Sequence, residues 1–90
     1  MYAVHHTVTI TDRSAAEAGL EAVVPRVSGR PGFVAGYWMA ITAGQGLALV
    51  VFDAEETARN FAEFLRSATD GLGVLLDRES IKVCEVFAHA

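Results

Sequence analysis

The order in which hydrophobic periodicity changes along the chain limits its fold more than any other feature. Residues 2–10 alternate with a period of two and are rich in β-branched side chains, which predicts a strand. An amphipathic stripe with helical spacing follows. Two segments with strand-like character, a second helical stripe and a last strand-like segment then complete the chain. The predicted strands are 2–10, 33–41, 47–52 and 81–88, and the predicted helices lie near 14–27 and 54–69.

Capping signals accompany both predicted helices. Ser14 and Glu17 have the spacing of a capping box, and Asp53 with Glu56 forms a second such signal. Pro25 lies inside the first helical stripe, where its missing N–H predicts a kink or an early end.

The connections also carry local signals. Residues 28–32 read as a turn, and residues 42–46 as a hairpin loop whose glycines can take positive φ. After the second helix, we expect a small apolar cluster to lie under that helix, formed by Leu72, Val74, Leu75 and Leu76.

Two right-handed strand–helix–strand crossovers around one hairpin predict an α+β, ferredoxin-like β-α-β-β-α-β fold. The expected sheet is antiparallel, has the order 4-1-3-2, and carries both helices on one face. Ninety residues are enough for a single domain, 1–90, since two separate cores would each be too small.

The predicted strands do not alternate between apolar and polar side chains. In 33–41, one row includes Phe33, Tyr37 and Met39 and the other includes Val34 and Trp38. If about 700 Å² of the second face were left in water, it would exceed the apolar patch of roughly 300–600 Å² that monomers tolerate. We therefore expect a homodimer that packs through the open sheet face, with either row of side chains turned toward the partner.

Charge and composition argue against several classes of partner. The net charge is −4 and no basic stripe is present, so neither nucleic acid nor an anionic membrane is an expected partner. The start of the chain does not read as a signal peptide, and no apolar run is long enough to span a membrane. The single Cys84 fits a reducing cytoplasm, and we expect it to be a buried structural thiol.

Two segments, Pro31–Trp38 and Val50–Glu56, resemble the dimeric α/β-barrel superfamily, which includes the antibiotic-biosynthesis monooxygenase-like proteins. The resemblance implies a sheet-to-sheet dimer with a pocket between sheet and helices in each protomer. It also implies a cofactor-free monooxygenase-like enzyme acting on a small apolar or aromatic molecule. The haem-degrading branch fits poorly, because its Asn belongs on the first strand, whereas Asn60 lies in the second helix here.

Histidines are the candidate polar groups of such a pocket. His5 and His6 are adjacent on a strand and therefore point to opposite faces, so one of them is the expected acid or base at the rim. His89 and Glu85 could approach the same strand, but three or four ligands are needed for a metal, and no metal site is predicted.

Aromatic side chains are the candidate pocket walls. Tyr37 and Trp38 point to opposite faces, and one of them would form the floor. Phe61 and Phe64 of the second helix could wall the same pocket, although all four side chains could equally serve in packing.

The sequence leaves three functions open. The chain is a cofactor-free monooxygenase-like enzyme, a non-catalytic module that binds a small apolar ligand, or a purely structural homodimer. Whether it is an enzyme is not decided by any motif, because no arrangement of residues fixes a chemistry.

Overall fold

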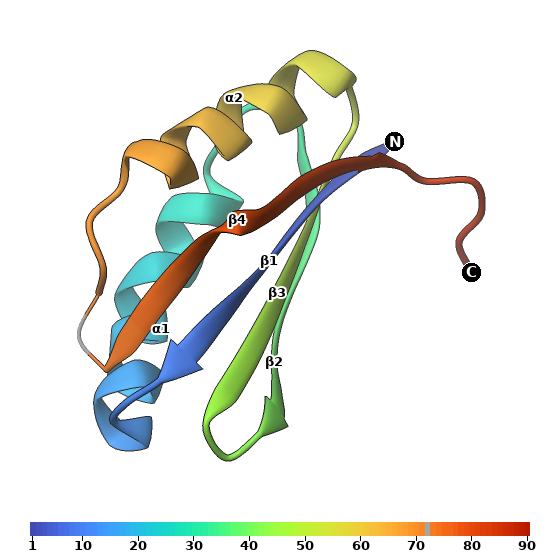
Figure 1. Cartoon of the computed structure of the whole chain (residues 1–90). Helices are drawn as coiled ribbons and strands as arrows, with labels where there is room; N and C mark the ends of the chain where they lie inside the picture. The colour runs from blue at the N-terminus through green and yellow to red at the C-terminus, as the bar shows by residue number, and fades with distance from the viewer. Residues whose placement is uncertain (72) are drawn as a thin grey trace.

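The computed structural model describes residues 1–71 and 73–90. Figure 1 shows a sheet and two helices that alternate along the chain in the predicted order. The elements are β1 (Tyr2–Ile10), α1 (Arg13–Ser28), β2 (Phe33–Thr42), β3 (Gln45–Phe52), α2 (Glu55–Ser67) and β4 (Val74–Glu85).

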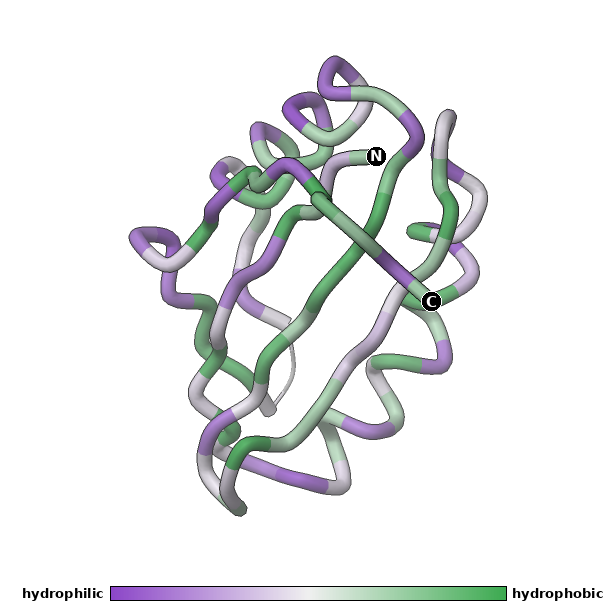
Figure 2. The backbone as a smooth tube through the Cα atoms, turned by 90° about the vertical axis from the view of Figure 1, so that its right-hand side faces the viewer, coloured by the Kyte–Doolittle hydropathy of each residue, from purple (hydrophilic) through white to green (hydrophobic). Residues whose placement is uncertain are grey.

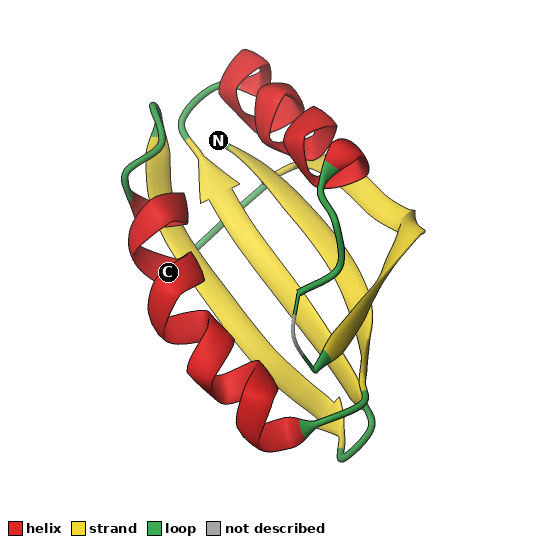
Figure 3. Cartoon of the chain, turned by 90° about the vertical axis from the view of Figure 1, so that its left-hand side faces the viewer, coloured by secondary structure: helices red, strands yellow, loops and turns green. Residues whose placement is uncertain are grey.

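The four strands form one antiparallel sheet in the order β2-β3-β1-β4, which is the predicted order 4-1-3-2 read from the other edge. Both helices lie on the same side of this sheet (Figure 3). Helix α2 packs on β1, β3 and β4, whereas α1 packs mainly on β2. The α+β, ferredoxin-like fold predicted from the periodicities is therefore confirmed.

Helix α2 is held by a continuous apolar stripe. Its buried residues recur every three or four positions, so they share one face of the helix. Two ion pairs support the exposed face, Glu55–Arg59 at 2.7 Å and Glu63–Arg66 at 2.9 Å. The stripe meets the inward side chains of the sheet and forms the core, whose members in α2 are Ala58, Phe61, Ala62 and Leu65.

Helix α1 has almost no stripe of this kind. Val27, near its C-terminal end, is its one buried residue. Of the kink or early end expected at Pro25, the early end does not occur, because the helix continues to Ser28. Pro25 is exposed, so its ring faces away from the sheet and the missing N–H falls on the solvent side. Most of α1 therefore stands over the sheet without filling the space beneath it.

The capping residues differ from those read in the sequence. Asp12 is the N-cap of α1 and accepts a hydrogen bond from the Ala15 N–H at 3.1 Å, so the helix begins before Ser14. Glu17 bonds to Arg13 instead of reaching back to a cap. In α2 the N-cap is Ala54, without a side-chain cap, because the helix begins one residue later than predicted.

Strand β4 is longer than predicted and begins earlier, at Val74 instead of residue 81, and it ends at Glu85. The polar residues before Ile81 lie opposite an irregularity in the β1–β4 pairing between His5 and Thr7. There the Ser80 hydroxyl accepts the Thr7 N–H at 2.8 Å and donates to the Asp77 carbonyl at 2.6 Å. The expected apolar cluster is thus the start of β4, apart from Leu72, which lies outside the described residues.

The β2–β3 hairpin is also tighter than predicted. Thr42 and Gln45 already belong to the strands and pair with each other, which leaves Ala43 and Gly44 in the turn. Positive φ occurs instead at Gly32, before β2, and at Gly73, before β4.

The second face of the sheet carries no helix, and the strands seen from this side are largely hydrophobic (Figure 2). Tyr37 and Met39 pair with Leu49 and Leu47 on this face, and Tyr37 is 54% exposed. Trp38 packs against the core on the other face. The structure thus turns Trp38 inward and Tyr37 outward, a choice that the sequence left open. Neither predicted row is kept whole, because the register shifts between Phe33 and Ala35, so Phe33 packs against the core and Val34 is exposed.

Candidate functional site

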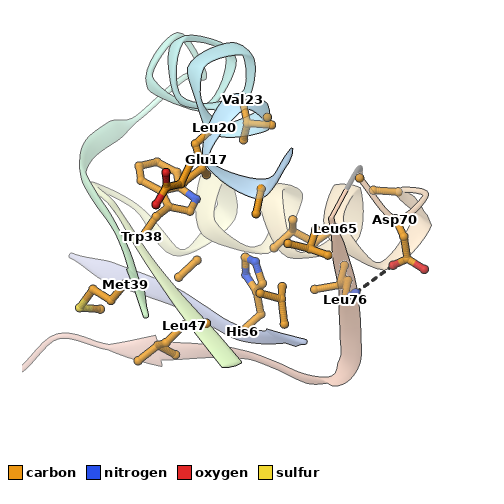
Figure 4. A pocket seen from close by; sticks show the side chains of 18 of the residues that line it. His6, Glu17, Leu20, Val23, Trp38, Met39, Leu47, Leu65, Asp70 and Leu76 are labelled. Atoms are coloured by element: carbon orange, nitrogen blue, oxygen red, sulfur yellow. Dashed lines mark hydrogen bonds between the residues drawn. The ribbon is translucent and has the colours of Figure 1, made fainter. Parts of the chain in front are cut away.

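A cavity of about 710 Å³ lies between the sheet and the two helices. Figure 4 shows His6 and Trp38 directed into it from the sheet, with Leu20 and Val23 of α1 above them. Met39 and Leu47 also border the cavity, but their side chains point away toward the opposite face in the same view. The volume falls within the range of roughly 300–1,000 Å³ that is typical of small-molecule sites.

Small residues in the middle of the sheet create the floor of this cavity. Ala48 of β3 pairs with His6 on one side and with Trp38 on the other, so two rings flank a methyl group. The next inward row is smaller still, because Gly46 pairs with Val8 and with Ala40. The rings of His6 and Trp38 stand beside these small residues, which leaves space for a flat ligand.

The Trp38 side chain occupies one side of the cavity floor and is directed away from Ala40 and Gly46. A Cβ built on Gly36 would lie 2.7 Å from Trp38 Cη2 and 2.8 Å from Cζ3. The indole therefore lies over Gly36, toward the start of β2, and leaves the space above Ala40 unfilled.

The helices supply two apolar walls that do not close on each other. The wall from α1 carries short side chains over its first half, which follows from the weak apolar stripe of this helix. It is formed by Ala16, Gly19, Leu20 and Val23. The opposite wall comes from the end of α2 and the start of β4, and consists of Phe64, Leu65, Ala68, Val74 and Leu76.

Charged side chains occur at the rim, where most already have a partner. Arg13 and Glu17 form an ion pair at 2.8 Å. Asp70 accepts the Leu76 N–H at 2.9 Å and lies 3.6 Å from Arg78. Arg26 also borders the cavity. The rim is polar, but its polarity is largely satisfied within the chain.

His6 is the polar side chain that is buried within the cavity wall. It is 8% exposed, and its Nδ1 is closed off from solvent without a hydrogen-bond partner. Burial lowers the pKa of His6 below its ordinary value of 6.5, and the neighbouring His5 lowers it further. The imidazole is therefore neutral at neutral pH, and it is an unpaired polar group in an apolar site.

The structure separates the six candidate residues into three groups. His6, Trp38 and Phe64 border the cavity. His5 pairs with Leu49 and Lys82, and Tyr37 with Leu49, on the open face, so neither reaches the cavity. Phe61 is 2% exposed and belongs to the core, where it lies 5.3 Å from Phe52 between ring centroids.

Sequence reasoning missed the small residues that make the cavity, namely Ala40, Gly46 and Ala48. A signal for them existed, since they are small residues grouped on the inward side of two adjacent strands, next to the large ring of Trp38. This pattern becomes readable only once the inward row is known, because the outward row is equally apolar.

The remaining polar candidates lie elsewhere. Within residues 1–71 and 73–90, no three side chains of His, Cys, Asp or Glu are grouped so that they could hold a metal ion. His89 is exposed in the tail that follows β4. Cys84 is exposed and pairs with Ala3 at the edge of the open face, so the expectation of a buried thiol was wrong.

Comparison with known proteins adds no assignment to this geometry. No protein-family model matches the chain, and no curated protein sequence is significantly similar to it. Within the described residues, neither helix has the length and the apolar composition needed to cross a membrane.

Proposed function

We propose that this protein binds a small, mainly apolar, flat molecule in the cavity between its sheet and its helices. The observation that carries the proposal is the cavity of about 710 Å³, partly open to solvent, over the small residues Ala40, Gly46 and Ala48. The apolar walls of this cavity are in contact with water, and a guest that covers them would remove apolar surface from water and gain dispersion contacts. Binding is thus a way for the fold to recover contacts that its own side chains do not make.

A neutral naphthylamine dye, N-phenyl-1-naphthylamine, tests this proposal directly. Trp38 is the single tryptophan and borders the cavity, so dye bound there should gain fluorescence and quench the Trp38 emission. Ala16→Leu adds side-chain volume on the cavity wall, and we expect it to weaken binding at least tenfold. Ala22→Leu places the same side chain on the exposed side of α1 and should leave binding unchanged.

The proposal fails if the dye shows no fluorescence change and no thermal stabilisation of the wild-type protein. It also fails if Ala16→Leu and Ala22→Leu bind the dye equally well, because the dye would then lie outside the cavity.

Cofactor-free monooxygenase-like catalysis is the second candidate function, and one observation favours it. His6 is a neutral imidazole in an apolar cavity, and if its proton were on Nδ1, the opposite tautomer to a hydrogen-bond donor at Nε2, Nε2 would be a suitable general base for removing a proton from an aromatic hydroxyl compound. Oxygen uptake in the presence of hydroxylated aromatic compounds would test it, with His6→Gln as the inactive comparison. Compounds that bind without any oxygen uptake would leave binding as the function.

We further propose that the protein acts as a homodimer through its open sheet face, as in the dimeric α/β-barrel superfamily. The tail after β4 leaves the sheet on the side of this face (Figures 1 and 2), and Phe87 within it is 94% exposed. Tyr37, Met39 and Leu75 are exposed on the face itself. A second copy offers the same apolar surface, so one two-fold contact would cover the faces of both chains. Sedimentation should give roughly twice the chain mass of 9.6 kDa, and a monomer at micromolar concentration would refute the proposal.

A further inference from the structure

The two nitrogens of His6 have different surroundings. Nδ1 is closed off from solvent and has no hydrogen-bond partner, whereas Nε2 is not among the buried, unpaired polar atoms of the described residues. Because His6 borders the cavity, Nε2 is the nitrogen left to face it. Any polar contact between this ring and a guest is therefore made at Nε2.

The position of the ring proton follows from the cost of each alternative. A neutral imidazole carries one proton, so one nitrogen donates and the other accepts. A buried N–H without an acceptor is rarer in proteins than an acceptor with an unused lone pair. The sealed Nδ1 is thus better left unprotonated, which places the proton on Nε2 and directs an N–H into the cavity.

We propose that the bound molecule carries a hydrogen-bond acceptor, a carbonyl or ether oxygen on an apolar aromatic body, and that this oxygen accepts from His6 Nε2–H. The inference rests on the proposed function and narrows its ligand class. The cavity floor supports this inference, because Ala48 is small enough for a flat aromatic body to lie between the rings of His6 and Trp38. His6 is the polar side chain in the buried part of the site. A ligand with one hydrogen-bond acceptor would therefore match the one donor that this part of the site provides.

Two naphthalenes of similar shape provide the test. 2-Acetylnaphthalene has a carbonyl acceptor, and 2-ethylnaphthalene has none. A net hydrogen bond contributes about 0.5–1.5 kcal/mol, so we expect the ketone to bind roughly 2–12-fold more tightly to the wild-type protein. His6→Phe keeps an aromatic ring without the N–H, and it should remove this preference while still binding 2-ethylnaphthalene.

Two spectroscopic readouts separate a hydrogen bond from a change in packing. The carbonyl stretch of bound 2-acetylnaphthalene should move to lower wavenumber in the wild-type protein and not in His6→Phe. Nitrogen-15 spectra should show the His6 proton on Nε2 in the free protein.

The possible results distinguish the inference that the ligand carries an acceptor from the proposed function, ligand binding in the cavity. If neither naphthalene binds, the proposed function fails. If both bind with equal affinity, or if the His6 proton lies on Nδ1, the cavity is a binding site but the acceptor inference is overturned.

Discussion

The indole of Trp38 lies over Gly36, two residues earlier on the same strand, and occupies the place where a side chain at residue 36 would be. This contact turns the ring toward the start of β2 and leaves the floor above Ala40 and Gly46 open. The orientation of the Trp38 ring thus depends on the absence of a side chain at Gly36, and the open space of the cavity depends on this orientation.

Gly36→Ala should therefore push the Trp38 ring toward the cavity. A Cβ at residue 36 would come within 2.7 Å of the ring, and overpacking of this kind costs about 1–3 kcal/mol. We expect a lower free energy of unfolding in urea, an altered near-ultraviolet circular dichroism band of Trp38, and weaker dye binding. Gly44→Ala is the matched control, because a Cβ there meets no atom within 4 Å.

Asp12→Ala should destabilise the protein more than Ser14→Ala. Asp12 accepts from the Ala15 N–H, and loss of such a cap costs about 0.5–2 kcal/mol. Ser14 lies inside the first turn of α1 and caps nothing, so its replacement should change the free energy of unfolding by less than about 0.5 kcal/mol. Equal effects in urea denaturation would contradict the assignment of Asp12 as the cap.

Phe61→Ala and Phe64→Ala should differ sharply, although both side chains belong to α2 and their rings stack at 6.2 Å. Phe61 is 2% exposed and contacts the core, so its truncation should cost about 3–5 kcal/mol. Phe64 is 50% exposed and borders the cavity, so its loss should affect dye affinity more than stability. Thermal unfolding and dye titration of the two variants would separate these roles.

His6 should make the protein less stable as the pH falls below about 6.5. The pKa of His6 is lowered in the folded state, so the unfolded chain takes up the proton first as the pH falls. The free energy of unfolding therefore decreases between pH 6.5, the ordinary pKa, and the lower pKa of the folded state. The stabilisation is fully present above pH 6.5, and no further loss occurs below the folded pKa. Urea denaturation between pH 5 and 8 should show this slope in the wild-type protein.

His6→Leu provides the comparison for this slope and should remove the part due to His6. The charged side chains that border the cavity are unchanged in this variant, so their contributions cancel in the difference; they are Arg13, Glu17, Arg26 and Asp70. Identical pH slopes for both proteins would contradict the prediction.

A charge on the open face should separate the proposed dimer without unfolding the chain. Tyr37 is 54% exposed in the single chain, so Tyr37→Glu should be tolerated by the monomer fold but not by an apolar interface. Sedimentation should show the variant at the monomer mass, whereas Ala22→Glu on the exposed side of α1 should remain dimeric. A dimer that persists in Tyr37→Glu would place the contact elsewhere.

The order of elements was determined by the sequence alone, because periodicity and local propensity act over a few residues. Alternation in β1 and the stripe of α2 could be read without any neighbour, and so could the fact that adjacent histidines face opposite ways. The inward row of β2 could not be read, because both rows are apolar and only pairing with β3 brings Trp38, and not Tyr37, under the helices. The extension of β4 back to Val74 was equally hidden, since it depends on pairing with β1 across a bulge that Ser80 stabilises.

The candidate site was decided by the tertiary structure for the same reason. The sequence placed a pocket between sheet and helices and proposed six side chains for it, of which His6, Trp38 and Phe64 lie there. It could not show that Ala48 would stand between His6 and Trp38, since these three residues come from three strands and meet only through the register of the sheet. A cavity is space that side chains do not fill, and it exists only once every element around it has been placed.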